Sequence, residues 1–167
     1  MMLRSTLAAA LFVLPAAAFA QPTTTTDPAP APVRFVDALD WPTRDAGTAS
    51  FGEAEDRLNM AFDRLCGDTF CEGDYSNLTP LQLSCSVDAT KATLKQCLWV
   101  FAGSHASVNP KSGAVQATAK LFKCKLLLAK DTPVDAFYEV MTGGDPLNDK
   151  LPMTNHSVYD GLLGCLW

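Results

Sequence analysis

The chain has 167 residues, of which 48% are hydrophobic, and a formal net charge of −5 at pH 7. This length and composition predict one domain with its own hydrophobic core, which excludes the very small scaffolds that need disulfides to fold at all. The mild acidity and the absence of a Lys/Arg cluster along the sequence argue against nucleic acid or an anionic lipid surface as the partner.

Residues 1–20 have the pattern of a cleavable secretory leader. Arg4 supplies a positive charge, an uncharged apolar run follows over 7–14, and Ala18-Phe19-Ala20 matches the small-x-small pattern that signal peptidase recognises. The apolar run is too short to span a bilayer as a helix, so we expect no stable membrane anchor. The sequence therefore predicts a signal peptide over 1–20 and a periplasmic or extracellular mature protein.

Residues 21–33 read QPTTTTDPAPAPV and show no apolar periodicity. A stretch dominated by Pro and Thr does not bury enough apolar surface to order itself. We therefore expect a flexible Pro/Thr-rich spacer over 21–33, followed by a single disulfide-braced α+β domain over 34–167.

The first predicted element of the domain is a helix that begins at Ser50. Ser50 and Glu53 match the capping box S-x-x-E, and Gly67 is well placed to end the helix. Apolar residues recur at three- and four-residue spacing between them: Phe51, Ala54, Leu58, Ala61, Phe62 and Leu65. This stripe predicts a helix with one buried side and one side in water.

Two strands are predicted next, joined as a hairpin. Residues 81–87 alternate with a period of two, and residues 93–101 carry apolar side chains on both faces, as in a central strand covered on both sides. Folding the chain about Lys91 gives four opposed pairs: Val87 with Lys95, Cys85 with Cys97, Leu83 with Trp99, and Leu81 with Phe101. Three of these pairs match apolar residues or cysteines, as a correct register should.

A third strand is expected over residues 120–128. The preceding residues 115–119 alternate in the opposite phase, which predicts a β-bulge near Lys120. The sequence Asn109-Pro110-Lys111-Ser112-Gly113 supplies turn chemistry before this strand. The three strands are expected to form an antiparallel meander.

Two helices complete the expected fold. Thr132-Pro133 is expected to begin the first, with Thr as N-cap. Asn155 or Ser157 is expected to begin the second, in which Gly161 and Gly164 lower the helix propensity, so that packing or a disulfide must hold it. The fold class is therefore α+β and disulfide-stabilised: an N-terminal helix, a three-stranded antiparallel β-meander and two C-terminal helices, all packed on one face.

All six cysteines follow the predicted leader, which is typical of a disulfide framework in an oxidising compartment. Their predicted positions favour three bonds among the fifteen pairings: Cys66–Cys71, Cys85–Cys97 and Cys124–Cys165. One rival register stays open. A second hairpin that turns at the bond between Pro110 and Lys111 would place Cys97 opposite Cys124.

No pattern of residues identifies a catalytic, cofactor-binding or metal site, and we predict none. His105, in an expected polar loop, and His156, beside the last helix cap, are better explained as solvated side chains than as catalytic bases. Asp68, Glu72 and Asp74 lack the alternating order of a calcium loop, so a solvated acidic turn explains them better.

Two tripeptides match the N-glycosylation pattern, beginning at Asn77 and Asn155, and they matter only in a eukaryotic source. Rigid scaffolds tend to carry function on loops, so we expect a contact region made of loop 103–113 and the turn near Tyr75.

The expected function is protein binding: a secreted or periplasmic module, with an inhibitor or immunity protein against a secreted toxin or enzyme as the narrower hypothesis. Another protein is the expected partner, and no cofactor is expected. Two alternatives stay open. One is a small secreted hydrolase built around His105 or the Asp68–Asp74 loop, and the other is a structural component of a cell-envelope assembly.

Overall fold

The computed structural model describes residues 32–167, so the predicted leader (1–20) and most of the predicted spacer (21–33) lie outside the described residues. Residues 32–167 contain an antiparallel sheet of order β1-β2-β3-β4, in which β5 also pairs with β3. The strands are β1 (Phe35–Asp37), β2 (Thr79–Asp88), β3 (Thr93–Val108), β4 (Val115–Lys125) and β5 (Thr132–Pro133).

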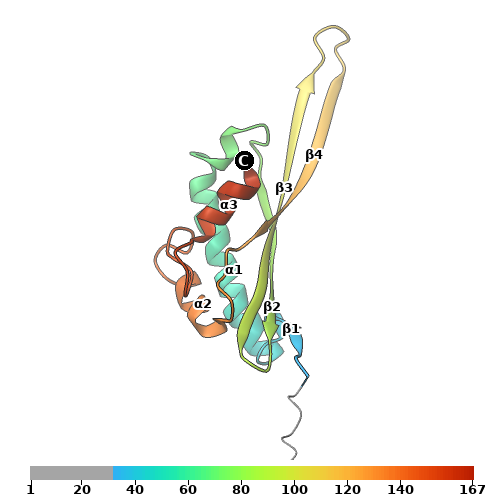
Figure 1. Ribbon diagram of the computed structural model, residues 1–167. Helices are drawn as coiled ribbons and strands as arrows, with labels where there is room; N and C mark the ends of the chain where they lie inside the picture. Colours follow the sequence, from blue (N-terminus) through green and yellow to red (C-terminus); the bar gives the residue numbers. More distant parts are fainter. Residues whose placement is uncertain (1–31) are drawn as a thin grey trace, which may run out of the picture. The chain divides into compact units, whose positions relative to one another are not determined.

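Three α-helices lie against one face of this sheet (Figure 1). They are α1 (Arg44–Cys66), α2 (Val134–Met141) and α3 (Val158–Leu166), and two short 3-10 helices, η1 (Ala38–Asp40) and η2 (Phe70–Glu72), flank α1. The predicted α+β class and antiparallel sheet are confirmed. The predicted arrangement differs in detail, because the sheet has five strands rather than three and β1 precedes the first helix. Among the described residues, no helix combines the length and the apolar character needed to cross a bilayer.

The core lies between α1 and the central strands. Phe51, Ala54, Leu58, Ala61 and Phe62 are all buried, so the stripe predicted for the first helix is its packing face. The ring of Phe62 lies 5.8 Å from that of Trp99 in an edge-on arrangement and 4.8 Å from that of Phe101. Burial of each such aromatic side chain contributes about 1.5–3 kcal/mol to folding.

The predicted start of this helix was wrong. α1 begins at Arg44, and the Thr43 hydroxyl caps it by accepting from the Ala46 N–H at 3.4 Å. Ser50 lies exposed inside the helix, and the Glu53 carboxylate binds Arg57 at 3.0 Å rather than a backbone donor at Ser50. A capping box is a local pattern, and here the helix already continues from an earlier cap.

The β2–β3 register is confirmed at its centre, where Cys85 faces Cys97 and Leu83 faces Trp99. The two outer pairs were wrong, because the register shifts between Pro80 and Gln82 and again between Ser86 and Val87. As a result, Pro80 faces Phe101 and Val87 faces Leu94. The first leaves Leu81 55% exposed. The second replaces the predicted Val87–Lys95 pair with a pair of buried aliphatic side chains, which favours burial on this face.

The β3–β4 hairpin is much longer than expected. Its register runs without a shift from Leu98 opposite Lys125 to Val108 opposite Val115, so the predicted bulge near Lys120 and the predicted polar loop around His105 were wrong. The bulge prediction assumed that apolar residues mark a buried face, whereas residues 115–121 are exposed on both faces. The outer face of β3 is also only half covered, at Leu98 and Val100, because all the helices lie on the other side.

Both C-terminal helices form close to their predicted starts. α2 begins at Val134, one residue later than expected, because Thr132 and Pro133 pair with β3 as β5. Pro133 rather than Thr132 is the N-cap, and no side-chain hydrogen bond caps the helix. Ser157 caps α3, as one of the two expected starts. A Cβ at Gly161 would lie 2.9 Å from the Lys125 carbonyl oxygen, so the glycine that weakens the helix also lets it approach β4 closely.

Three disulfides join Cys66 to Cys71, Cys85 to Cys97, and Cys124 to Cys165. These are the three pairs that the sequence analysis favoured. The rival pairing does not form because Trp99, two residues from Cys97, faces Cys124. The last bond ties α3 to β4.

Replacement of Cys124 and Cys165 together by Ser should lower the free energy of unfolding by roughly 3–4 kcal/mol, because the bond closes a long loop in the unfolded chain. The Cys66–Cys71 bond closes a loop of only a few residues. The matched variant, Cys66→Ser with Cys71→Ser, should therefore lose only about 2 kcal/mol of unfolding free energy. Urea unfolding of both variants measures the difference. An equal or larger loss in the short-loop variant would contradict this ranking.

Candidate functional site

The outer half of the β3–β4 hairpin forms an arm, defined here as residues 103–120. It extends beyond the helices as a two-stranded ribbon (Figure 1). Every residue from Ser104 to Leu121 is exposed, except Asn109, which is half-buried. Two strands without a covering layer are marginally stable in water, so an arm of this length is an unusual feature to retain without a contact.

A hydrogen-bonded turn closes the tip of the arm. The Asn109 side-chain oxygen accepts from the Lys111 N–H at 2.9 Å and from the Ser112 N–H at 3.2 Å. The Asn109 N–H donates to the Ala114 carbonyl at 2.9 Å, and Gly113 has a φ of +70°, which suits glycine. The turn chemistry predicted for residues 109–113 is therefore correct.

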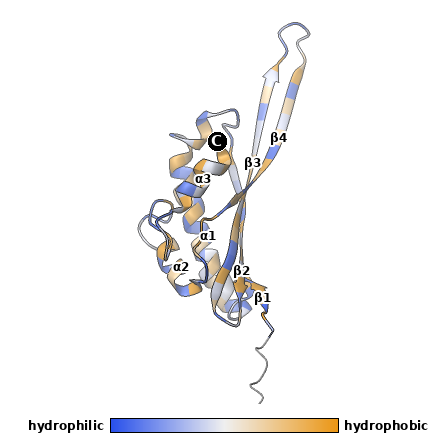
Figure 2. Cartoon of the chain, viewed as in Figure 1, coloured by the Kyte–Doolittle hydropathy of each residue, from blue (hydrophilic) through white to orange (hydrophobic). Residues whose placement is uncertain are grey.

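The two faces of the arm differ in character. Phe101 and Phe122 mark the helix side, and the alternation along each strand places polar residues on that side of the arm: His105, Ser107, Gln116, Thr118 and Lys120. Apart from Ser104, the opposite face of the arm carries apolar residues, and the pair at its base, Ala102 and Leu121, continues this face. The apolar residues within the arm are Ala106, Val108, Val115, Ala117 and Ala119. Figure 2 shows this alternation along the ribbon. Val115 is 72% exposed, so no described layer covers this apolar face.

The turn near Tyr75 fastens the base of the arm. The Asn77 side chain accepts from the Ser104 N–H and donates to the Ser104 hydroxyl, each at 2.6 Å. A Cβ at Gly103 would lie 2.9 Å from both Tyr75 Cβ and Leu78 Cδ2, so only glycine admits this close approach. The two segments expected to form a contact region therefore meet, although the first is a β-ribbon rather than a loop.

A cavity of about 560 Å³ lies beside this junction. Its lining includes one lysine and several apolar side chains: Phe70, Tyr75, Leu78, Lys120, Phe122, Leu166 and Trp167. The Lys120 ammonium lies 4.3 Å from the centre of the Phe122 ring, a favourable cation–π distance. Glu72 and Asp74 add acidic groups to the lining. These apolar walls can receive an apolar group of a ligand, beside the charges of Lys120, Glu72 and Asp74.

His105 lies exposed on the arm opposite Thr118. No acidic residue occurs between Asp88 and Asp131, so neither strand of the arm supplies a carboxylate to orient the imidazole. Nothing in this arrangement favours a catalytic base.

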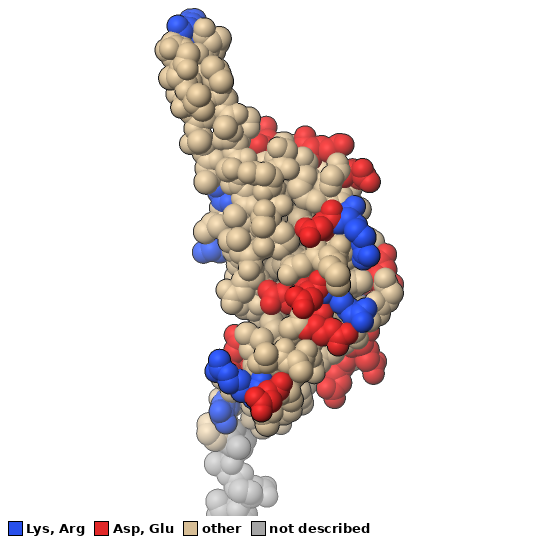
Figure 3. All heavy atoms as spheres, turned by 180° about the vertical axis from the view of Figure 1, so that it is seen from behind, with Lys and Arg blue, Asp and Glu red and all other residues tan. Residues whose placement is uncertain are grey.

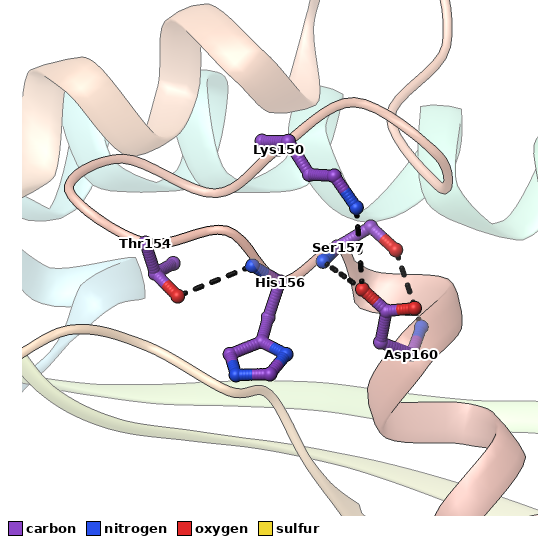
Figure 4. Close-up of polar contacts among 5 residues, drawn as sticks. All are labelled: Lys150, Thr154, His156, Ser157 and Asp160. Carbon is purple, nitrogen blue, oxygen red and sulfur yellow. Dashed lines mark hydrogen bonds and ion pairs between the residues drawn. The ribbon is translucent and has the colours of Figure 1, made fainter.

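His156 precedes the capping box of α3 (Figure 4). Its N–H donates to the Thr154 hydroxyl at 3.2 Å, and its imidazole takes no part in the contacts drawn. The Ser157 N–H donates to Asp160 at 2.8 Å, and this hydrogen bond, assisted by nearby Lys150, lowers the pKa of Asp160. The polar groups here stabilise a helix end.

The acidic turn predicted at Asp68, Glu72 and Asp74 spans the end of α1 and η2. Within residues 32–167, no three His, Cys, Asp or Glu side chains converge as metal ligands. Glu72 and Asp74 instead belong to the cavity at the base of the arm.

Sequence reasoning missed the arm as an element, although a signal was present. Residues 89–130 contain seven lysines, no arginine and no acid, whereas the other described residues contain five Lys or Arg and 17 Asp or Glu. The lysines are spread too thinly to form a cluster in sequence, yet five of them lie on the β3–β4 hairpin: Lys95, Lys111, Lys120, Lys123 and Lys125. Figure 3 shows the arm free of acidic atoms, with a basic tip, while acidic atoms lie over the body.

Comparisons of the chain with models of protein families, with curated proteins and with solved structures found no match.

Replacement of Asn77 by Ala should loosen the arm, because it removes both hydrogen bonds to Ser104. We expect a loss of about 1 kcal/mol in unfolding free energy and faster hydrogen exchange at the Ser104 amide. Asn155→Ala is the control, since Asn155 is exposed and its side chain forms no hydrogen bond within residues 32–167. Unchanged Ser104 exchange in Asn77→Ala would show that these bonds do not hold the base.

Tyr138 on α2 should make the protein sensitive to alkali. Burial, followed by the charges of Asp135 and Asp37, raises the pKa of Tyr138 to about 12, above its value of about 10 in an unfolded chain. The neutral phenol thus contributes stability that is complete below pH 10 and is lost as the pH rises through 12. Tyr138→Phe should lose less stability over this range, as measured by urea unfolding at each pH. Parallel curves for the two proteins would contradict the assignment.

Proposed function

We propose that the protein is a secreted or periplasmic protein-binding module whose contact surface is the arm. The observation that supports this most directly is the exposed apolar face of the ribbon, which includes Val108 at 64%, Val115 at 72% and Leu121 at 59% exposed. Contiguous apolar surface of this kind, outside the core, is typical of protein contact sites.

The proposed compartment follows from the cysteines. All six are paired, and such bonds persist in oxidising compartments rather than in the cytosol. The leader pattern over residues 1–20 supports the same location. The narrower proposal is an inhibitor or immunity protein. It is supported by the small size of the disulfide-bonded domain and by the exposed arm that projects from it.

The test pairs an arm variant with a matched surface variant. Immobilised wild-type protein should capture a discrete partner from the extracytoplasmic fraction. The double variant Ala106→Asn with Ala117→Asn alters two facing residues of the apolar face, and it should weaken binding of the purified partner about tenfold. Ala49→Asn, at an exposed position of α1, should bind as the wild type does.

Three other outcomes would contradict this function. Equal partner binding by the arm variant would remove the arm from the interface. Fractionation with large envelope assemblies, with no discrete partner, would favour the structural role. A hydrolytic activity lost in His105→Ala without a change in thermal stability would favour an enzyme. Loss of a captured enzyme's activity on binding would support the narrower inhibitor proposal.

A further inference from the structure

The arm leaves one long strand edge without a partner among the described residues. In an antiparallel ladder, successive residues point their N–H and C=O groups alternately toward the neighbouring strand and away from it. The Asn109 N–H crosses to Ala114, whereas the Ser104 N–H points away from β4 to Asn77. The residues of β4 that share the outward orientation are Val115, Ala117, Ala119, Leu121, Lys123 and Lys125.

This outer edge of β4, residues 115–123, is the end of the sheet. The strand order stops at β4, and β5 pairs with the far end of β3 at Thr93 and Leu94. α3 meets β4 at the inner end of the strand, where Gly161 lies against the Lys125 carbonyl oxygen and Cys165 is bonded to Cys124. The outward N–H groups from Val115 to Lys123 form a template on which another strand can pair.

The charged side chains of β4 and of the tip of the arm are all lysines. Lys120 and Lys123 lie on opposite faces of β4, Lys125 follows, and Lys111 lies at the tip. None of these four lysines forms an ion pair within residues 32–167, where the lysines that do so are Lys91 and Lys150. Unpaired lysines on both sides of a strand edge attract acidic side chains on either face of an added strand.

We propose that the outer edge of β4 binds an extended, acidic segment of a partner protein by strand addition. This inference rests on the proposed function and names the chemistry of its partner. Backbone hydrogen bonds to the outward N–H and C=O groups supply the binding energy, and the lysines select for Asp and Glu. The small side chains of Ala117 and Ala119 leave the edge open to close approach.

Two other occupants fit the edge less well. Two copies joined along β4 would bring their lysines together, and like charges opposite each other destabilise a strand pair. A single-stranded nucleic acid is held by several stacking aromatics or arginines, and residues 102–121 contain no Phe, Tyr, Trp or Arg. The row of outward peptide groups, by contrast, matches only another peptide backbone.

Two proline variants test the edge. Ala117→Pro removes an outward N–H of β4 while leaving the ladder to β3 intact, because proline is tolerated where a strand N–H faces solvent. Phe35→Pro makes the same change on the opposite edge of the sheet, at the first residue of β1. The Arg34 carbonyl accepts from the Ala89 N–H, so the next N–H along the strand, that of Phe35, points outward. The probe is a ten-residue peptide of alternating Glu and Thr, with an alternating Lys and Thr peptide as control.

Wild-type protein and Phe35→Pro should bind the Glu/Thr peptide with affinities within about twofold, and Ala117→Pro should bind it about tenfold or more weakly. Binding should slow hydrogen exchange at Ala117, Ala119 and Leu121, and it should weaken as salt rises. Lys123→Glu should weaken binding, whereas Lys130→Glu, at another exposed lysine, should not. The Lys/Thr peptide should not bind.

The results separate this inference from the proposed function. Equal binding by both proline variants, or preference for the Lys/Thr peptide, would overturn strand addition at β4. Exchange protection at these amides in concentrated protein alone would assign the edge to a second copy, and tighter binding of a ten-residue oligothymidylate would assign it to nucleic acid. A partner whose capture depends on Ala106 but not on Ala117 would keep the arm as the binding surface while refuting this edge.

Discussion

The β3–β4 ladder continues without interruption past the point where the helix layer ends. Leu98 to Phe101 lie over the core, and the same register carries the pairs from Gly103 to Val108 into solvent. Backbone pairing therefore continues along this hairpin beyond the point where its side chains cease to be buried. The buried half of the hairpin packs against the helices, and the exposed half is the candidate binding surface.

Gly103 marks the boundary between the two halves. On one side, Phe101 joins the aromatic cluster with Phe62 and Trp99. On the other, Ser104 is held only by Asn77 and by the strand opposite. The close approach of Tyr75 at Gly103 makes the base rigid, and a rigid base limits the entropy lost when a projecting ribbon binds.

The sequence predicted the parts of the fold in which burial and local pattern agree. Three features were predicted correctly because the type of side chain matches its environment. They are the buried stripe around Leu58, the Cys85–Cys97 register and the start of α3 at Ser157. It failed where apolar residues lie in solvent. Ala117 and Ala119 alternate in the opposite phase to the buried residues of the next segment, so the sequence predicted a bulge. The small, polar residues around His105 are typical of a loop, so the sequence predicted one there.

The sequence by itself determined the α+β class, the packing face of α1, the tip turn and the positions of six cysteines, because periodicity, turn residues and cysteine spacing act locally. Only the tertiary structure decided that residues 103–120 form a ribbon and that scattered lysines gather along one strand edge. The physical reason is that strand pairing is a contact between distant residues. Whether a strand ends or continues depends on the partner opposite, and no window of sequence contains both.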